Sequence, residues 1–180
     1  GMGFIEETGA AQYMRDARIV TIYEGTTGIQ AMDLVGRKIL RDKGQAVGEL
    51  IAELKAFKAD LDAQGDDFKS MQARFTRALQ ALETTTQWYL DQVPNDPDLP
   101  GSIAFNYLMM MGYVVAGWLM AKSAIAAKRL IDQGSDDVFY RNKINTATFF
   151  CEHILPRSEG LQSTVQSGSA STMSIAVDAF

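Results

Sequence analysis

Apolar residues recur at intervals of three and four through most of this sequence, a spacing that places side chains on one face of an α-helix. The longest such stripes predict helices over Gln45–Ala63, Asp67–Gln92, Ser102–Gln133 and Val138–Ile154. Short polar turns separate them, and three of the four prolines fall in the predicted loop Val93–Gly101. Four long amphipathic helices with short connections predict an all-α fold, an up-and-down helical bundle.

The residues before the bundle predict extra N-terminal helices. Glu6–Arg15 has a helical pattern, whereas the β-branched stretch Arg18–Tyr23 predicts an extended connection. A further helix is predicted from Thr27 to about Arg41, ended by Gly44 in a left-handed conformation. Its apolar stripe consists of Ile29, Met32, Val35, Gly36, Ile39 and Leu40.

These patterns divide the chain into three parts. We expect residues 1–44 to precede the bundle, 45–165 to form it, and 166–180 to be a tail. The small and polar composition from Leu161 onward predicts loose packing there, after a short turn or helix that begins at Pro156.

Composition and charge argue against several classes of function. The chain is 47% hydrophobic and 22% charged, as in ordinary globular proteins. Its 17 Lys and Arg are scattered among 22 Asp and Glu, which argues against nucleic acid as a partner. A single cysteine, Cys151, excludes an internal disulfide, and with one histidine, His153, no metal site is predicted. The lone cysteine is consistent with a reducing compartment, and we expect a cytoplasmic location.

One segment has the length of a membrane span. Leu99–Ala121 contains 23 residues without a charge, enough to cross a bilayer. It also contains Pro100, Gly112 and Gly117, and its apolar pattern continues past Lys122 as an amphipathic helix. The sequence therefore favours a buried core helix and no membrane span.

A short acidic loop, Ile22–Gln30 (IYEGTTGIQ), carries the main candidate for chemistry. Glu24 is followed by Gly25, which gives the backbone freedom, and Thr27 and Gln30 have capping-box spacing. Burial among apolar neighbours would raise the pKa of Glu24, as a general base requires, whereas the helix N-terminus favours its carboxylate. The residue types alone leave open whether Glu24 is a catalytic base or an acid beside a helix start.

Other polar groups are less specific. Arg15–Arg18 (RDAR) is interpreted as a charge pair at a helix end. Cys151 and His153 lie two residues apart, so they do not share a helix face, which argues against a Cys–His pair. The run Met109–Met111 is interpreted as adaptable core. The hydroxyls of Thr84–Thr86 have no partner base in the sequence.

Three motifs together favour the interpretation of Glu24 as a catalytic base. Gly1–Phe4 (GMGF), Tyr13–Arg18 (YMRDAR) and Ile22–Gln30, in this order and spacing, resemble the C-terminal end of the acyl-CoA dehydrogenase family. The sequence beyond Ala46 resembles the additional helical region of the longer members, those similar to the 3-methylmercaptopropionyl-CoA dehydrogenases. The resemblance covers essentially the whole chain but only the last part of such an enzyme. It implies that residues 1–44 end the catalytic helical domain and that residues 45–165 are a C-terminal four-helix-bundle extension.

The resemblance also implies roles for the loop. Glu24 would remove the α-proton of an acyl-CoA substrate while the β-hydrogen leaves as a hydride to FAD, and an acceptor flavoprotein would take the electrons onward. The Glu24 backbone N–H would polarise the thioester carbonyl. Gly25 would border the acyl chain, and Thr26, Thr27 and Gly28 would approach the FAD. The family more often has glutamine at position 28, so no side-chain contact to FAD is implied there.

Two hypotheses follow. In the first, the chain is the C-terminal portion of an FAD-dependent acyl-CoA dehydrogenase, excised or natively truncated, and alone neither binds FAD tightly nor turns over acyl-CoA. In the second, it is a stand-alone helical bundle that serves in association and retains the motif by descent. A second copy would then cover the stripe of Ile29–Leu40, which predicts a homodimer.

Overall fold

The computed structural model describes residues 1–23 and 27–179, and within them every regular element is helical. The α-helices are α1 (Ala10–Tyr23), α2 (Thr27–Met32), α3 (Gln45–Asp62), α4 (Lys69–Gln92), α5 (Leu99–Asp132), α6 (Val138–Phe149) and α7 (Arg157–Gln166). Two π-helical segments, Asp33–Leu40 and Phe150–Ile154, continue α2 and α6. Short 3-10 turns occupy Glu6–Thr8, Asp66–Phe68, Val93–Asn95 and Val177–Ala179.

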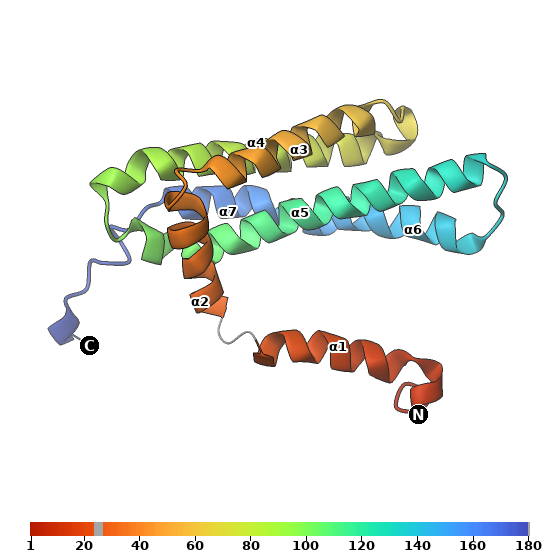
Figure 1. The fold of residues 1–180 in the computed structure, drawn as a ribbon, viewed down its shortest axis with the longest axis horizontal. Coiled ribbons are helices and arrows are strands. Elements are labelled where there is room, and N and C mark those ends of the chain that lie inside the picture. The colour runs from red at the N-terminus through yellow and green to blue at the C-terminus, as the bar shows by residue number, and fades with distance from the viewer. Residues whose placement is uncertain (24–26, 180) are drawn as a thin grey trace.

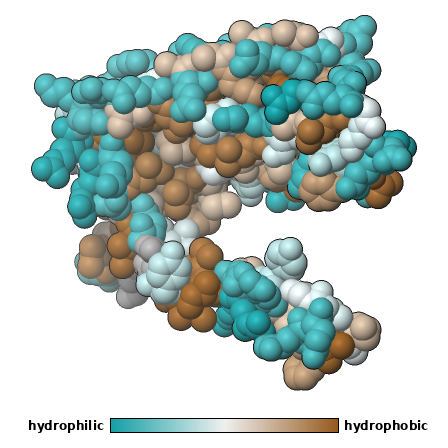
Figure 2. Space-filling view, turned by 45° about the vertical axis from the view of Figure 1, so that its right-hand side comes forward, coloured by the Kyte–Doolittle hydropathy of each residue, from teal (hydrophilic) through white to brown (hydrophobic). Residues whose placement is uncertain are grey.

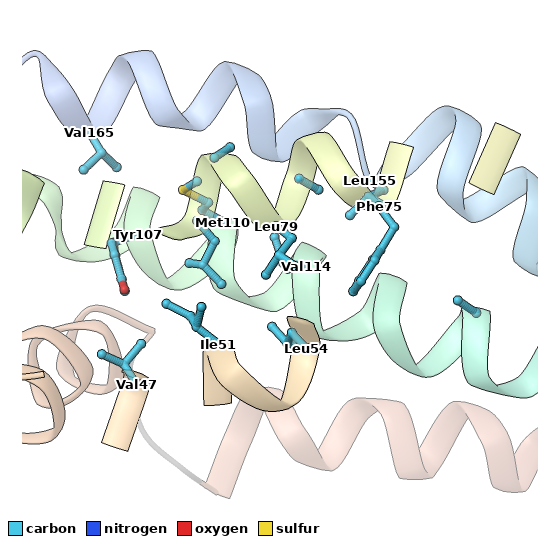
Figure 3. Packing of buried hydrophobic residues seen from close by; sticks show 14 of the residues in the cluster. Val47, Ile51, Leu54, Phe75, Leu79, Tyr107, Met110, Val114, Leu155 and Val165 are labelled. Carbon is cyan, nitrogen blue, oxygen red and sulfur yellow. The ribbon is translucent and has the colours of Figure 1, made fainter. Parts of the chain in front are cut away.

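The four predicted long helices form the expected bundle. Helices α3, α4 and α5 run up and down, and α6 with α7 returns along α5 as the fourth rod (Figure 1). Apolar side chains from all four rods meet along the bundle axis (Figure 3). The labelled ones are Val47, Ile51, Leu54, Phe75, Leu79, Tyr107, Met110, Val114, Leu155 and Val165. The prediction of an all-α helical bundle is confirmed.

Helix α5 is the central element. It contacts α2, α3, α4, α6 and α7. Among the helices that the structure describes, it is the one long and apolar enough to cross a membrane, a test that core helices of soluble proteins also pass. It begins at Leu99 rather than Ser102, with Pro100 in its first turn, where the missing N–H of proline removes no helical hydrogen bond.

Helix α2 and the π-helical segment after it pack on the bundle, but with a face that differs from the predicted stripe. Ala31, Val35 and Ile39, spaced by four, are buried, whereas Ile29 and Met32 are exposed. The π-helical backbone bonds over five residues instead of four, and its wider turn favours the four-residue spacing. As predicted, Gly44 ends the helix: its φ is 83° and its N–H donates to the Ile39 carbonyl at 2.8 Å.

The N-terminal residues form one arm. The helix predicted over Glu6–Arg15 is confirmed from Ala10 onward, whereas Glu6–Thr8 forms a separate 3-10 turn. Helix α1 runs unbroken to Tyr23, so the prediction of an extended stretch over Arg18–Tyr23 is wrong. β-Branched residues weaken a helix only slightly, and a helix satisfies its own backbone hydrogen bonds where no strand partner is available. None of its residues is buried, and α1 stands away from the bundle (Figure 1).

The C-terminal helix is also longer than predicted. Helix α7 packs against α4 and α5 through Gln166 and buries Ser158 and Val165, so the loose packing predicted from Leu161 begins only after this helix. The Ser169 hydroxyl donates to Asp96 at 2.6 Å and ties the end of this helix to the α4–α5 connection.

Candidate functional site

Three residues of the predicted catalytic loop lie outside the described residues. Glu24, Gly25 and Thr26 are not described, so their roles remain predictions. Thr27 and Gly28 begin α2, and both are exposed. Apart from its chain neighbours and its own helix backbone, no described residue places an atom within 4 Å of the position that a Cβ would take at Gly28.

The residues just before the loop do not form an apolar enclosure. The side chains of Ile22 and Tyr23 are 59% and 63% exposed. The desolvation that would raise the pKa of a carboxyl group at this place would therefore have to come from other surfaces.

The segment after the loop is fixed by the bundle. The π-helical segment Asp33–Leu40 lies against α3 and α5, with Val35 fully buried. The Tyr89 hydroxyl, on α4, donates to the Val35 carbonyl oxygen at 3.3 Å. On the outer side of the same segment, Arg37 Nε lies 3.1 Å from Asp33 Oδ1. The segment after the loop is thus held on the bundle by this buried hydrogen bond and the packing around it.

A second buried hydrogen bond lies beside the first. The rings of Tyr89 and Tyr107 are 6.2 Å apart. The Thr86 hydroxyl donates to the Leu82 carbonyl at 2.7 Å, so the Tyr107 hydroxyl is the donor in its 2.6 Å contact with Thr86 Oγ1. Burial raises the pKa of both tyrosines to about 12, with the neighbouring Tyr107 adding to the rise at Tyr89. Sequence reasoning missed both bonds because their partners are far apart in the chain.

The remaining polar candidates do not come together. Cys151 is buried, and burial, then Glu152, raises the pKa of its thiol to about 12. His153 is exposed, with its ring 4.8 Å from that of Phe149. Among the described residues no cluster of His, Cys, Asp or Glu could hold a metal ion.

The RDAR motif lies in the middle of α1, so its interpretation as a helix-end pair is wrong. The helix continues through Tyr23, beyond both arginines, instead of ending near them. Arg15 is 3.4 Å from Glu6, which belongs to the preceding 3-10 turn.

A groove of about 660 Å³ runs between α3 and α4. Val47, Ile51 and Leu90 line it, and the Lys55–Glu83 ion pair lies at its edge. The ion pair is half exposed, and neither Thr27 nor Gly28 reaches this groove. The groove is therefore separate from the candidate loop.

The start of α2 fits a cofactor only in part. Thr27 and Gly28 lie in the first turn of α2, where a helix offers their N–H groups no acceptor of its own, and Thr27 adds a hydroxyl. These groups can bind the oxygens of an anionic or carbonyl group. Neither residue lines the groove between α3 and α4 or the pocket formed by Gly3–Glu7 and α1. The donors suit FAD, and an enclosing surface would have to come from elsewhere.

Comparisons with known protein families cover both parts of the chain. Residues 1–40 match the model described as "Acyl-CoA dehydrogenase, C-terminal domain". Residues 50–176 match the model described as "Acetyl-CoA dehydrogenase C-terminal like". The junction between the two matches falls at the end of the π-helical segment and in α3.

Curated relatives align over most of the chain. The 3-methylmercaptopropionyl-CoA dehydrogenase of Ruegeria pomeroyi is 39% identical over 86% of the chain and 26% of its own length. The broad-specificity linear acyl-CoA dehydrogenase FadE5 of Mycobacterium tuberculosis is 34% identical over 87% of the chain and 27% of its own length. A butyryl-CoA dehydrogenase of Syntrophomonas wolfei is 31% identical over 100% of the chain and 30% of its own length. The chain thus spans between 26% and 30% of these relatives.

Proposed function

This chain belongs to the acyl-CoA dehydrogenase family, and we propose that it is the C-terminal portion of an FAD-dependent enzyme that forms the α,β double bond of an acyl-CoA thioester. The observation that carries the proposal is the family match over residues 1–40, which includes the motif Ile22–Gln30 in which we place the base. The names of the aligned relatives, all acyl-CoA dehydrogenases, support the same reaction class.

In this proposal Glu24 is the general base. Its carboxylate accepts the α-proton of the substrate, which requires an approach within about 2.6–3.2 Å. Its backbone N–H polarises the thioester carbonyl, and Gly25 leaves room for the acyl chain. Thr26, Thr27 and Gly28 bind FAD with hydroxyl and backbone N–H groups at the start of α2. Bound FAD would accept the β-hydrogen together with its electron pair. An acceptor flavoprotein would then receive the electrons.

We further propose that this chain alone is inactive. The exposure of Ile22, Tyr23, Thr27 and Gly28 supports this, because proton abstraction and flavin binding need an enclosed, water-poor site. The purified chain should show no flavin absorbance after incubation with FAD and gel filtration. It should also form no enoyl-CoA with an artificial electron acceptor. A yellow protein or enoyl-CoA formation would show that the chain is sufficient by itself.

The role of Glu24 is tested in the complete enzyme that contains this segment. Glu24→Gln should abolish dehydrogenation and leave FAD bound, because the amide cannot accept the proton but keeps the size of the side chain. Glu7→Gln, on the exposed turn before α1, is the matched control and should leave the rate unchanged. Loss of flavin in Glu24→Gln would indicate a structural role for Glu24 instead.

A specific observation also favours the second candidate function, association. The prediction of a homodimer rested on the stripe of Ile29–Leu40, but α5 and α3 of the same chain cover Val35 and Ile39. Val35 and Ile39 therefore offer no surface to a second copy, whereas Ile29 and Met32 of the same stripe are exposed. A different apolar face, on α5, remains uncovered.

A further inference from the structure

The first turn of α2, with Thr27 and Gly28, is held in place from one side. The arm α1, which precedes the loop, contributes no buried residue and stands away from the bundle in the space-filling view as well (Figure 2). Helix α2 contacts α5, and the π-helical segment after it contacts α3 and α5. Among the residues that the structure describes, the packed connection to the loop therefore comes from the bundle.

Ala31 determines how closely α2 approaches the bundle. It is the buried residue of this short helix, it is fully covered, and it lies one helical turn after Thr27. Protein interiors are close-packed, so a larger side chain at a fully covered alanine would push the two packed surfaces apart. The small size of Ala31 thus sets the distance between the first turn of α2 and the helix beneath it.

The hydrogen bond from Tyr89 determines the rotation of the segment that follows α2. The predicted apolar stripe and the observed buried face share Val35 and Ile39 and differ toward the start of α2, where the structure buries Ala31. Apolar contacts at the two shared residues alone therefore do not select one face over the other. The Tyr89 hydroxyl donates to the Val35 carbonyl oxygen, and a hydrogen bond has a required direction and length. It favours the observed rotation.

The Tyr89 hydroxyl has no alternative acceptor in the core. Tyr89 is fully buried, and among the described residues the Val35 carbonyl is the acceptor that the structure gives its hydroxyl. Tyr107, whose ring lies 6.2 Å away, donates its own hydroxyl to Thr86 instead. A rotation that removed the Val35 carbonyl would leave a buried donor without a partner, which disfavours any other docking of the segment.

We propose that Tyr89 is a positioning residue for flavin binding: through the Val35 carbonyl, and together with Ala31, it fixes the place and rotation at which Thr27 and Gly28 meet FAD. Val35 lies eight residues after Thr27, about 12 Å along a helix, so Tyr89 acts on these donors only through the helix that joins them. The inference rests on the proposed function, because FAD is the ligand of α2 there. It gives the bundle a task in the reaction.

Hydrogen–deuterium exchange in this chain tests the contact itself. Tyr89→Phe removes only the hydroxyl, and the amides of residues 33–40 should exchange roughly two- to tenfold faster relative to those of α5, the range for one hydrogen bond. Tyr107→Phe is the matched control, because it removes a neighbouring buried hydroxyl that bonds Thr86 and not this segment. It should leave the relative rate unchanged. Equal acceleration by both variants, or none by Tyr89→Phe, would overturn the proposal.

FAD binding by the complete enzyme that contains this segment tests the consequence for the site. Tyr89→Phe should raise the dissociation constant of FAD about tenfold, since small misplacements of binding groups are costly, and Tyr107→Phe should leave it unchanged. Saturating FAD should restore kcat and the KM for acyl-CoA in Tyr89→Phe, because the chemical groups are intact.

The outcomes separate this inference from the proposed function. A flavin-containing wild-type enzyme with an unchanged FAD dissociation constant in Tyr89→Phe would overturn the positioning role and leave the function standing. A complete wild-type enzyme that binds no flavin would overturn the function, and with it any role of Tyr89 in flavin binding.

Ala31→Val tests the second contact in the same enzyme. The larger side chain should displace the first turn of α2 and raise the dissociation constant of FAD roughly tenfold. Ala78→Val is the matched control, because Ala78 is also fully buried but lies on α4, eleven residues before Tyr89. It should leave FAD binding unchanged, and circular dichroism should show that both variants fold. Equal weakening by the two variants would overturn the role of Ala31.

Discussion

At the scale of single residues, neighbouring threonines on α4 occupy opposite situations. Thr85 and Thr86 are both buried. Thr86 Oγ1 donates to the Leu82 carbonyl and accepts from Tyr107, whereas Thr85 Oγ1 has no hydrogen-bond partner among the described residues. A buried hydroxyl without a hydrogen-bond partner destabilises the folded state, whereas one with its partners stabilises it. The two threonines therefore allow a hydrogen-bonded buried hydroxyl to be compared with an unbonded one on the same helix.

We predict opposite effects for the same substitution at these two sites. Thr86→Val should lower the free energy of unfolding by about 1–3 kcal/mol, because it leaves the buried Tyr107 hydroxyl without an acceptor. Thr85→Val should be neutral or raise it by up to about 1 kcal/mol. Urea unfolding followed by tryptophan fluorescence measures both. Equal destabilisation by the two variants would mean that packing, and not the hydrogen bonds, decides.

The buried tyrosine hydroxyls and the buried cysteine thiol also predict a change in stability at high pH. Burial raises the pKa of Tyr89 and Tyr107 from 10.0 to about 12, and that of Cys151 from 9.0 to about 12. The unfolded chain therefore releases these protons at lower pH than the folded chain does. Their contribution is complete below pH 9 and is lost as the pH rises toward 12, by up to about 1.4 kcal/mol per pH unit for each group.

Unfolding free energies between pH 8 and pH 11.5 check this expectation. The curve should be flat at first and then fall, and the double variant Tyr89→Phe/Tyr107→Phe should fall less steeply. A flat curve through pH 11 would contradict burial of these groups. Absorbance of tyrosinate should also show two tyrosines that ionise late.

At the scale of elements, glycines end two helices under different constraints. Gly44 has φ 83° before α3, and Gly134 has φ 95° after α5. An added Cβ would stand 2.6 Å from Leu90 Cδ1 at Gly44 and would meet nothing within 4 Å at Gly134. The two sites share the conformational requirement, and only Gly44 adds close packing against α4.

Alanine at each position should separate these two costs. Gly134→Ala should lower the free energy of unfolding by about 1–2 kcal/mol, the cost of a left-handed conformation. Gly44→Ala should cost more, because Leu90 must also move, and Leu90→Ala in the same chain should recover part of the difference. Thermal unfolding by circular dichroism measures all three. Equal losses in the free energy of unfolding would show that the Leu90 side chain moves away from the added Cβ at no cost.

The presence of a helix was predictable where the apolar stripe runs over a long stretch. Which face of a helix is buried was not predictable. The stripes of the bundle helices and the stop at Gly44 follow from local sequence. The exposure of Ile29 and Met32 does not, because docking on α5 decides which side is buried. The hydrogen bond from Tyr89 to Val35 joins residues 54 positions apart, beyond any local pattern. The candidate site came from a motif resemblance, and its base stays a prediction because Glu24 lies outside the described residues.

At the scale of the whole molecule, the bundle and the segment after the loop share one core. Ala31, Val35 and Ile39 belong to the same buried cluster as the bundle side chains. The arm α1 contributes no buried residue to it. The division at residue 44 that the sequence suggests stays a prediction, and residues that precede it, Ala31, Val35 and Ile39, pack into the core of the bundle that follows it.

Two truncations test where the folding unit begins. The chain 27–180 should unfold within about 0.5 kcal/mol of the full chain, because α1 loses no buried contact. The chain 45–180 should lose at least about 3 kcal/mol, since it exposes the core surface under Val35 and Ile39 and leaves the Tyr89 hydroxyl without its acceptor. Guanidinium unfolding of the three chains measures the difference. Equal stability of 45–180 and 27–180 would mean that the bundle folds unaided and that residues 27–44 are an attachment to it.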